Sequence, residues 1–278
     1  MTNGLENVLW LGGPPGAGKT TVARLLARRH GLRWYNSDAH TWEHRDRAIA
    51  AGHWAAIQYE EMTIPDRWSA SLEDRFAMSL HRVRGPMIQD DLRALPTAPL
   101  TIAEGTPITP KVVGNGSALW LFPTSRLQRK RLNERNLNSG IRDLYEHLSG
   151  VIAKEVVKFR GRIVAIDESW SLEQVVTETE RHFSALLKSG PAAIGRVERR
   201  QLLRYANRAL VDQYRTYFAR PWAQALEGIS DVVLPFSCEC AHDGCEEQVS
   251  VAVSEFPAPP DVTSPPLLAQ GHGAIRYN

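Results

Sequence analysis

Short apolar runs alternate with segments of helical periodicity along the first two thirds of this 278-residue chain. In the helical segments apolar residues recur every three or four positions, as on the buried face of a helix. The apolar runs are short enough to be buried strands and occupy residues 8–11, 32–36, 100–104, 118–122 and 162–166. Strands that alternate with helices predict an α/β fold, in which a parallel five-stranded sheet carries helices on both faces.

The same pattern predicts how the chain is divided. Within a first domain, residues 1–190, a mostly helical insert over residues 41–95 is broken by glycine and proline and is rich in Trp, Arg and His. After a Ser-Gly-Pro boundary, Arg196–Leu226 has the periodicity of one or two helices. We therefore expect residues 196–278 to form a helical linker and a small C-terminal α/β appendage that ends in an extended, proline-rich tail.

The composition is that of an ordinary soluble protein, with 43% hydrophobic and 23% charged residues. A net charge of +2 gives no sign of a strong polyanion footprint. The N-terminus lacks the pattern of a leader peptide, and no apolar stretch has the length of a membrane span. The three cysteines all lie within residues 238–245, and their odd number argues against a disulfide framework. We predict a cytoplasmic protein without a membrane partner, and we leave its oligomeric state open.

Residues 13–20 match the pattern G-x-x-x-x-G-K-[ST] between a predicted strand and a predicted helix. The three glycines allow successive backbone N–H groups to point into one concavity, and the start of the helix adds positive potential. Lys19 can bind the same phosphates, and the Thr20 hydroxyl can ligate Mg²⁺. The stretch predicts a nucleoside-triphosphate site formed by Gly13, Pro14, Pro15, Gly16, Ala17, Gly18, Lys19, Thr20 and Thr21.

Two carboxylates follow predicted strands at the sheet edge where open α/β folds bind ligands. Asp38 could accept the proton of an attacking hydroxyl, and the alternative is that it caps the next helix. Glu104 suits Mg²⁺ binding or a contact to the phosphoryl acceptor, and the alternative is a solvated charge at a strand end. A functional role is favoured for Glu104, because Gly105 permits the close approach of a ligand.

The phosphate loop, Asp38, the sequence Glu104-Gly105-Thr106 and an arginine-dense segment after the fourth strand together resemble P-loop kinases. The closest resemblance is to the chloramphenicol phosphotransferase and zeta-toxin type kinases, and it spans residues 5–188. It implies ATP as the nucleotide, Asp38 as the base for the acceptor hydroxyl, and Glu104 and Thr106 beside the acceptor and the metal. The zeta-toxin pattern has an arginine shortly after this threonine, whereas this sequence reads Pro107 to Lys111, so no acceptor is carried over.

The arginine-dense segment, residues 124–140, matches the position of the mobile lid of such kinases. Cations that close over the phosphates would stabilise the charge of the transition state and exclude water. On a helix, Arg126 and Arg129 share one face while Arg131 and Arg135 share another, so the two pairs cannot both face the nucleotide. We assign the catalytic role in the lid to Arg126 and Arg129.

The acceptor is expected to bind against the helical insert, whose aromatic and basic residues could stack on a ring or hold a polar group. Trp42 and Trp54 are the candidate contacts. For each tryptophan, packing in an amphipathic core is the alternative.

Cys238, Cys240 and Cys245 are close enough in sequence to share a metal ion, and three cysteines with one histidine can hold tetrahedral zinc. The spacing C-x-C-x₄-C differs from the common C-x₂-C, so buried free thiols stay open as the alternative to a structural zinc. His272 is the expected fourth ligand in place of His242, because so short a loop does not easily wrap one ion with all four groups.

The sequence as a whole predicts an ATP- and Mg²⁺-dependent phosphotransferase that acts on a hydroxyl of a small molecule, such as a nucleoside, a sugar or an antibiotic. Two alternatives stay open. The same site could phosphorylate a nucleic-acid end or a nucleotide-sugar, with the basic helix Arg196–Arg220 serving binding. The protein could also be a nucleotide-binding regulator without catalysis.

Overall fold

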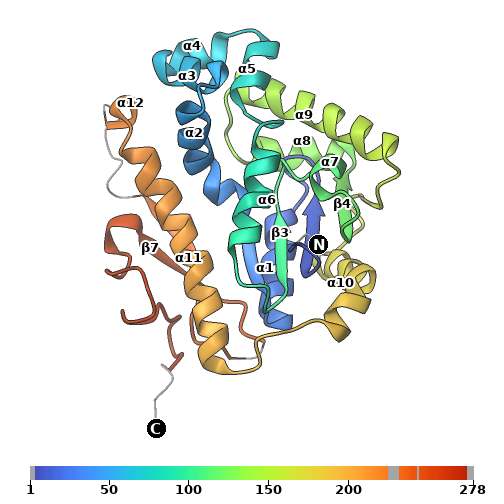
Figure 1. Cartoon of the computed structure of the whole chain (residues 1–278), viewed down its shortest axis with the longest axis vertical. Coiled ribbons are helices and arrows are strands. Elements are labelled where there is room, and N and C mark those ends of the chain that lie inside the picture. Colours follow the sequence, from blue (N-terminus) through green and yellow to red (C-terminus); the bar gives the residue numbers. More distant parts are fainter. Residues whose placement is uncertain (1–3, 225–231, 243, 274–278) are drawn as a thin grey trace.

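A parallel five-stranded sheet lies at the centre of the protein (Figure 1), for which a computed structural model describes residues 4–224, 232–242 and 244–273. The strands follow the order β2-β3-β1-β4-β5, and every neighbouring pair runs parallel. The carboxyl ends of all five strands therefore meet at one edge. The predicted fold class is confirmed, with strands at Val8–Gly12 (β1), Arg33–Asn36 (β2), Thr101–Glu104 (β3), Ala118–Pro123 (β4) and Ile163–Ile166 (β5).

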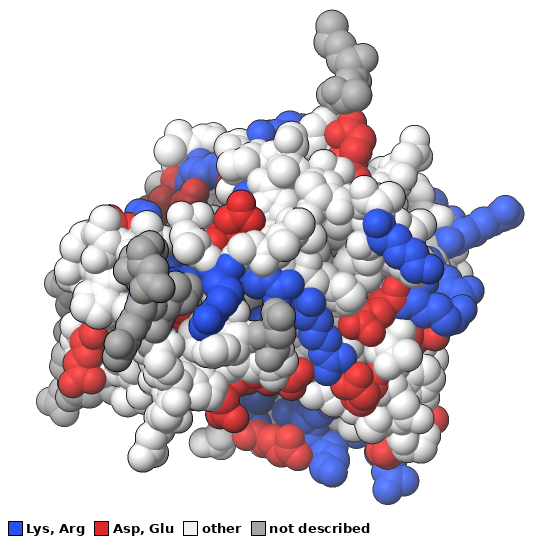
Figure 2. All heavy atoms as spheres, turned by 90° about the horizontal axis from the view of Figure 1, so that it is seen from below, with Lys and Arg blue, Asp and Glu red and all other residues white. Residues whose placement is uncertain are grey.

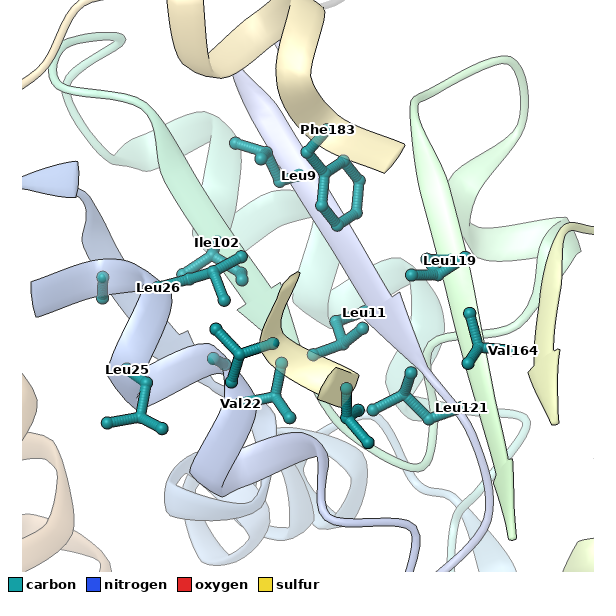
Figure 3. Close-up of a cluster of buried hydrophobic side chains, with 14 of the residues drawn as sticks. Leu9, Leu11, Val22, Leu25, Leu26, Ile102, Leu119, Leu121, Val164 and Phe183 are labelled. Carbon is teal, nitrogen blue, oxygen red and sulfur yellow. The ribbon is translucent and has the colours of Figure 1, made fainter. Parts of the chain in front are cut away.

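Helices cover both faces of this sheet because its strands are apolar on both sides. Leu9 and Leu11 of β1 point to one face, where the side chains of Figure 3 pack against α1 (Lys19–His30) and α10 (Leu172–Ser189). Trp10 of β1 points to the other face and belongs to a second buried cluster. The helices that supply this second cluster are α6 (Arg84–Ala94), α7 (Pro110–Val113) and α9 (Ser139–Lys158).

The predicted insert over residues 41–95 is helical. A short 3-10 helix, η1 (Ser37–His40), leads from β2 into it. The side chains of Thr63 and Ser71 accept hydrogen bonds from backbone N–H groups in the first turns of α4 and α5, which fixes where these helices begin. Besides α6, the insert consists of α2 (Thr41–Ala50), α3 (Trp54–Glu61), α4 (Ile64–Ser69) and α5 (Leu72–Met78).

The C-terminal part contains a long helix and a small antiparallel sheet of two strands. Alternating valines predict β7, whereas β6 gives no such signal because Pro235 lies in its middle. The predicted helix end at Leu226 and the last part of the predicted tail, residues 274–278, lie outside the described residues. The remaining elements are α8 (Ser125–Asn133), α11 (Arg196–Phe218), α12 (Pro221–Gln224), β6 (Val233–Ser237), β7 (Gln248–Ala252) and η3 (Val253–Glu255).

Helix α11 packs back against β2, η1 and α2, beside which it lies in Figure 1. Several of its basic residues point inward. Arg204 is buried and forms a two-pronged ion pair with buried Glu239, at 2.6 and 2.8 Å. Arg200 of the same helix and Arg220, two residues beyond its end, are buried as well. The three arginines therefore make internal contacts, and they are not on the surface, where a nucleic acid could reach them.

The exposed charges are mixed in sign. On the face shown in Figure 2, Lys and Arg lie between Asp and Glu, in agreement with the net charge of +2. No helix in the described ranges combines the length and the apolar composition of a membrane span.

Removing one partner of the Arg204–Glu239 pair is expected to destabilise the protein strongly. Arg204→Ala leaves the Glu239 carboxylate buried without its cation, which should lower the free energy of unfolding by about 3–5 kcal/mol. Arg208→Ala is the control on the same helix, because Arg208 and Asp212 form an ion pair with both side chains more than half exposed. That change should cost less than about 1 kcal/mol. Denaturant titration measures both values, and equal losses would contradict the assigned role of the buried pair.

Candidate active site

The phosphate loop leads from β1 into α1 as the sequence predicts. Gly13, Gly16 and Gly18 all have positive φ, a conformation that favours glycine. A side chain at Gly13 would also lie 2.4 Å from the Leu121 carbonyl oxygen, so β4 packs directly against the loop. Lys19 is buried, and its ammonium group donates a hydrogen bond to the Pro14 carbonyl at 2.9 Å. The loop is thus a backbone cradle with one cation at the start of a twelve-residue helix, which suits a phosphate chain.

Helix α8 lies over this loop, but with a different face from the one assigned above. Gln128 donates to the Pro15 carbonyl at 2.8 Å, and Arg131 donates to the Gly16 carbonyl at 3.0 Å. Arg126 is 88% exposed and pairs with Glu168 at 3.2 Å, and Arg129 is exposed too. The assignment of Arg126 and Arg129 to the nucleotide is therefore corrected. The burial of Leu127 and Leu132 sets the rotation of the helix, which turns Arg131 toward the loop.

Glu104 ends β3 between the ends of the two neighbouring strands, with Leu11 on one side and Asn36 on the other. Its side chain is fully buried, and neither carboxyl oxygen has a hydrogen bond of good geometry among the described residues. Burial raises the pKa of Glu104 to about 8, and the negative charge of Asp38 adds to the rise, while Lys19 opposes it. The alternative of a solvated charge is therefore wrong.

A buried carboxyl group beside the phosphate loop that has no partner of its own is suited to be a ligand of a divalent cation. The Thr20 hydroxyl lies close enough to lower the pKa of Glu104, so both predicted Mg²⁺ ligands are in one place. Gly105 plays a different part from the one expected. A side chain at this position would overlap the Ser37 hydroxyl at 1.7 Å, so the residue allows β3 and η1 to pack together rather than a ligand to approach.

Asp38 lies in η1, and its carboxylate is 54% exposed. The residue that caps η1 is Asn36, whose side chain accepts a hydrogen bond from the Asp38 backbone. Helix α2 begins after His40 without a side-chain cap. The Asp38 carboxylate therefore does not cap either helix, and it lies 3.9 Å from the Arg84 guanidinium.

A chain of hydrogen bonds holds Arg84 beneath Asp38. Asp91 accepts from His44 Nε2 at 2.7 Å, and His44 Nδ1 accepts from Arg84 Nε at 3.2 Å. Because a carboxylate can only accept and a guanidinium can only donate, His44 is the neutral tautomer with its proton on Nε2. Burial lowers the pKa of His44, in agreement with this state. Arg84 also donates to the Ser37 carbonyl, which ties the chain to η1. Asp91 is therefore a structural residue of the site.

One cavity of about 590 Å³ joins the phosphate loop to the helical insert. Lys19, Thr20 and Asp38 lie at one end, together with Thr106. The other end is enclosed by residues of the insert and of the C-terminal helices, in particular Trp42, Arg45, Tyr59, Arg67, Trp68, His81, Gln213, Tyr217 and Trp222.

Of the two tryptophans predicted to contact the acceptor, one lines this cavity and the other does not. Trp42 lines it, whereas Trp54 is 58% exposed and lies outside it. Sequence reasoning also missed the contribution of α11, where the Gln213 side chain accepts a hydrogen bond from the Trp42 backbone at 3.1 Å. Periodicity predicts a helix over these residues but does not tell which distant element its faces meet.

The four predicted zinc ligands come together between β6 and the tail. The ligand atoms of Cys238, Cys240, Cys245 and His272 lie within 4.8 Å of one another. His272 Nδ1 is 3.4 Å from Cys238 Sγ and 3.7 Å from Cys245 Sγ. Tetrahedral zinc holds such atoms about 3.6–3.8 Å apart, so the donor set and its spacing both fit the ion. His242 interacts with Arg196 instead, at 3.0 Å.

Comparison with solved structures finds matches of low similarity, among them two kinases and an uncharacterized protein. Shikimate kinase from Acinetobacter baumannii, in complex with shikimate, is 19% identical over 66% of this chain and 96% of its own, with a TM-score of 0.41. A sugar kinase from Janibacter sp. HTCC2649 is 16% identical over 64% and 96%, with a TM-score of 0.37. An uncharacterized protein from Eubacterium ventriosum is 12% identical over 64% and 97%, with a TM-score of 0.33.

No family model and no curated protein matches the sequence. At these low identities and TM-scores, the solved structures carry no argument about activity. The resemblance to chloramphenicol phosphotransferase and zeta-toxin type kinases stays a prediction.

Glu104→Gln should change how stability depends on pH. The carboxyl of the folded protein keeps its proton up to about pH 8, whereas that of the unfolded chain loses it near 4.5. The wild type is therefore expected to lose stability as the pH rises through this window, by on the order of 4 kcal/mol, while the glutamine variant should not. Denaturant titrations at several pH values, without nucleotide, measure the difference between the two proteins. Glu61→Gln, at an exposed position, is the control. If the difference in free energy of unfolding between Glu104→Gln and the wild type is the same at every pH, the prediction is wrong.

Proposed function

We propose that this protein is a kinase that transfers the γ-phosphoryl group of ATP to a hydroxyl group of a small molecule. The observation that supports it best is the single cavity, in which the phosphate loop and Asp38 face a separate, aromatic-lined end large enough for an acceptor. Both substrates would meet at the carboxyl edge of the sheet, as phosphoryl transfer requires.

In this proposal the loop from Gly13 to Thr21 binds the phosphates through its backbone N–H groups, and Lys19 binds the transferring group. Lys19 would exchange its internal hydrogen bond to Pro14 for the phosphate oxygens. Arg131 and Arg135 take the place of the two lid residues assigned from the sequence. Arg131 contacts the loop, and Arg135 lines the cavity and is close enough to Lys19 to lower its pKa. Their charge would stabilise the phosphoryl group in flight.

Asp38 is the proposed general base. Its carboxylate lines the cavity, is 54% exposed and lies beside Arg84, which orients it. Mg²⁺, held by Thr20 and Glu104, would neutralise phosphate charge. When Asp38 accepts the proton of the acceptor hydroxyl, the oxygen becomes a better nucleophile and is aimed along the line of transfer.

We also propose that the cluster of Cys238, Cys240, Cys245 and His272 binds a structural zinc ion. The backbone N–H of Ala269 points at Cys238 Sγ at 3.3 Å, a contact that stabilises a thiolate. The Arg28 guanidinium donates to the Cys238 carbonyl at 3.0 Å, which joins the cluster to the helix that follows the phosphate loop. A zinc ion would then fix the tail onto the rest of the protein.

Incubation with ATP, Mg²⁺ and a pool of hydroxyl compounds tests the proposed transfer by mass spectrometry. The pool holds nucleosides, sugars, nucleotide-sugars and hydroxylated antibiotics. A phosphoryl mass gain on one of them is expected with the wild type and not with Lys19→Ala, which removes the cation on the phosphates. Bound ATP without any modified compound would favour the regulator alternative, and modification of oligonucleotide ends would favour the nucleic-acid alternative.

Asp38→Asn should lower the turnover of that acceptor by about a hundredfold or more, because the amide cannot accept the proton. Asp90→Asn is the matched control, since Asp90 is a 62% exposed carboxylate outside the cavity. It is expected to leave turnover unchanged. A loss of only severalfold for Asp38→Asn would assign the proton to another group.

The zinc proposal predicts about one zinc ion per chain in protein purified without a chelator. His272→Ala should lose the metal, and His242→Ala should keep it, since only the first histidine lies in the cluster. Elemental analysis of the three proteins measures the ratio. Folded wild type without metal would identify the cysteines as buried free thiols.

A further inference from the structure

The charges that line the cavity are strongly unbalanced. Among the described residues, six cationic side chains line it, whereas the carboxylates that line it number one, that of Asp38. Two of the cations, Lys19 and Arg135, lie at the phosphate loop and the lid. The other four lie on the insert and are Arg45, Arg67, Arg75 and Arg84. Arg84 lies beside Asp38, whereas Arg45 and Arg67 lie at the aromatic end where the acceptor would bind.

Arg67 is buried more deeply than any other of these groups, at 1% exposure. Among the described residues it has no carboxylate within ion-pair distance, and its Nε and Nη2 donors have no hydrogen-bond acceptor. It contacts aromatic rings instead, with its guanidinium carbon 4.2 Å from the ring centre of Tyr59 and 4.0 Å from that of Trp222. Such contacts attract a cation but leave its N–H donors unsatisfied.

Arg45 repeats this arrangement on the neighbouring helix. It is 4% exposed, and its guanidinium carbon lies 3.8 Å from the ring centre of Tyr59. One of its nitrogens donates to the Met78 carbonyl at 2.7 Å, while Nε and Nη1 have no acceptor in the described structure. Burial lowers the pKa of Arg45 to about 10, so the group is still charged at neutral pH. Two guanidinium groups that contact the same tyrosine ring and line the same cavity thus keep buried N–H donors without an acceptor in the described part of the chain.

Other buried arginines of this chain do have partners. Arg220, which borders the same aromatic group, pairs with Asp46 at 2.6 Å and with Glu60 at 2.7 Å. Arg84 is held by the Ser37 carbonyl and by His44. Buried Arg33 also lacks an acidic partner among the described residues, but it donates to the Pro96 and Ala98 carbonyls. Among the described buried arginines, Arg45 and Arg67 combine the lack of an acidic partner with two guanidinium nitrogens that have no acceptor, and both line the cavity. A buried cation without an anion is costly to maintain, and a bound oxyanion would remove that cost.

We infer that the acceptor carries, besides its hydroxyl group, an anionic group that binds in the cavity to Arg67, with Arg45 contributing a second positive charge. The planar fork of each guanidinium matches the paired oxygens of a carboxylate or a phosphate. The rings of Trp42, Tyr59 and Trp222 enclose the rest of the molecule. The substrate class is thus an anionic hydroxyl compound, a hydroxy acid or a phosphorylated nucleoside or sugar, and not a neutral one. This inference deepens the proposed function and rests on it for the meaning of the hydroxyl group.

Calorimetric titration with matched pairs of compounds tests the inference without turnover. Each pair sets a neutral hydroxyl compound against its anionic counterpart: a nucleoside and its monophosphate, a sugar and its phosphate, a polyol and its hydroxy acid. At least one anionic member is expected to bind about tenfold or more tightly than its neutral partner. The pair that shows the preference identifies the oxyanion as phosphate or carboxylate.

Three variants locate the anion. Arg67→Met should abolish the preference, because it replaces the cation by an apolar side chain of similar length. Arg82→Met is the matched control, since Arg82 is exposed and lies outside the cavity. Lys19→Ala should keep the preference, because the anion does not depend on the phosphate loop. A preference that disappears with Lys19→Ala and persists with Arg67→Met would place the anion on the loop and overturn the inference.

The stability of the free protein gives a second readout that does not depend on the choice of compounds. If Arg67 is an unpaired buried cation, Arg67→Met should leave the melting temperature unchanged or raise it. If the guanidinium instead serves to hold Tyr59 and Trp222 together, the melting temperature should fall, and the inference is then wrong. Equal binding of the neutral and anionic members of every pair, or no binding by any of them, would also overturn it.

The two proposals fail in distinguishable ways. Anion binding that depends on Arg67, without any phosphoryl transfer, would refute the proposed kinase activity and leave the anion site. Transfer to neutral acceptors that is insensitive to Arg67→Met would refute the anion site and leave the kinase activity.

Discussion

Burial of ionisable groups without an internal ion-pair partner is the constraint on which the site depends. Glu104 at the sheet edge and Arg67 in the insert are both withdrawn from water, and in the described structure neither meets a group of opposite charge at ion-pair distance. Such groups destabilise a fold unless the packing around them holds the chain in place. Here the two apolar clusters that cover the sheet provide this packing near Glu104, and the strand ends keep Glu104 beside Lys19 and Asp38. A third cluster within the insert, against which Tyr59 packs, provides it near Arg67. Each of the two groups is left for a ligand to pair with, a metal ion at Glu104 and an anion at Arg67.

The same chain shows what paired burial looks like. Arg204 and Glu239 are as deeply buried, yet they meet at 2.6 Å and Asn207 adds a hydrogen bond to the carboxylate at 2.9 Å. That pair lies between α11 and the cysteine loop, outside the cavity of the phosphate loop, and joins two elements. Burial alone therefore does not distinguish a binding residue from a structural one. The difference lies in whether the surrounding side chains satisfy its donors and acceptors.

The parts of the site that the sequence predicts are those fixed by local structure. The phosphate loop is a contiguous motif, and Asp38 and Glu104 are predicted because strands of a parallel sheet end at the same edge. The choice between two faces of α8 could not be predicted, since it depends on where Leu127 and Leu132 find a core. Arg45 and Arg67 were missed for a related reason, because in a sequence a buried arginine looks like a solvated one. The aromatic wall from α11 comes from residues more than 150 positions away, and no local pattern reports such a contact.

Helix α11 connects the C-terminal part to the acceptor end of the cavity. In its N-terminal half Arg204 holds Glu239, which lies between Cys238 and Cys240, and near its end Tyr217 lines the cavity. A helix rises 1.5 Å per residue, so these two positions are about 20 Å apart. The cysteine cluster is therefore too distant to touch an acceptor, and its influence on the site has to pass through the position of α11. Because the ring of Trp222 just beyond that helix packs on Arg67, any shift of α11 would alter the surroundings of the unpaired cation. The C-terminal residues thus shape the acceptor end, while the reacting groups belong to the edge of the sheet.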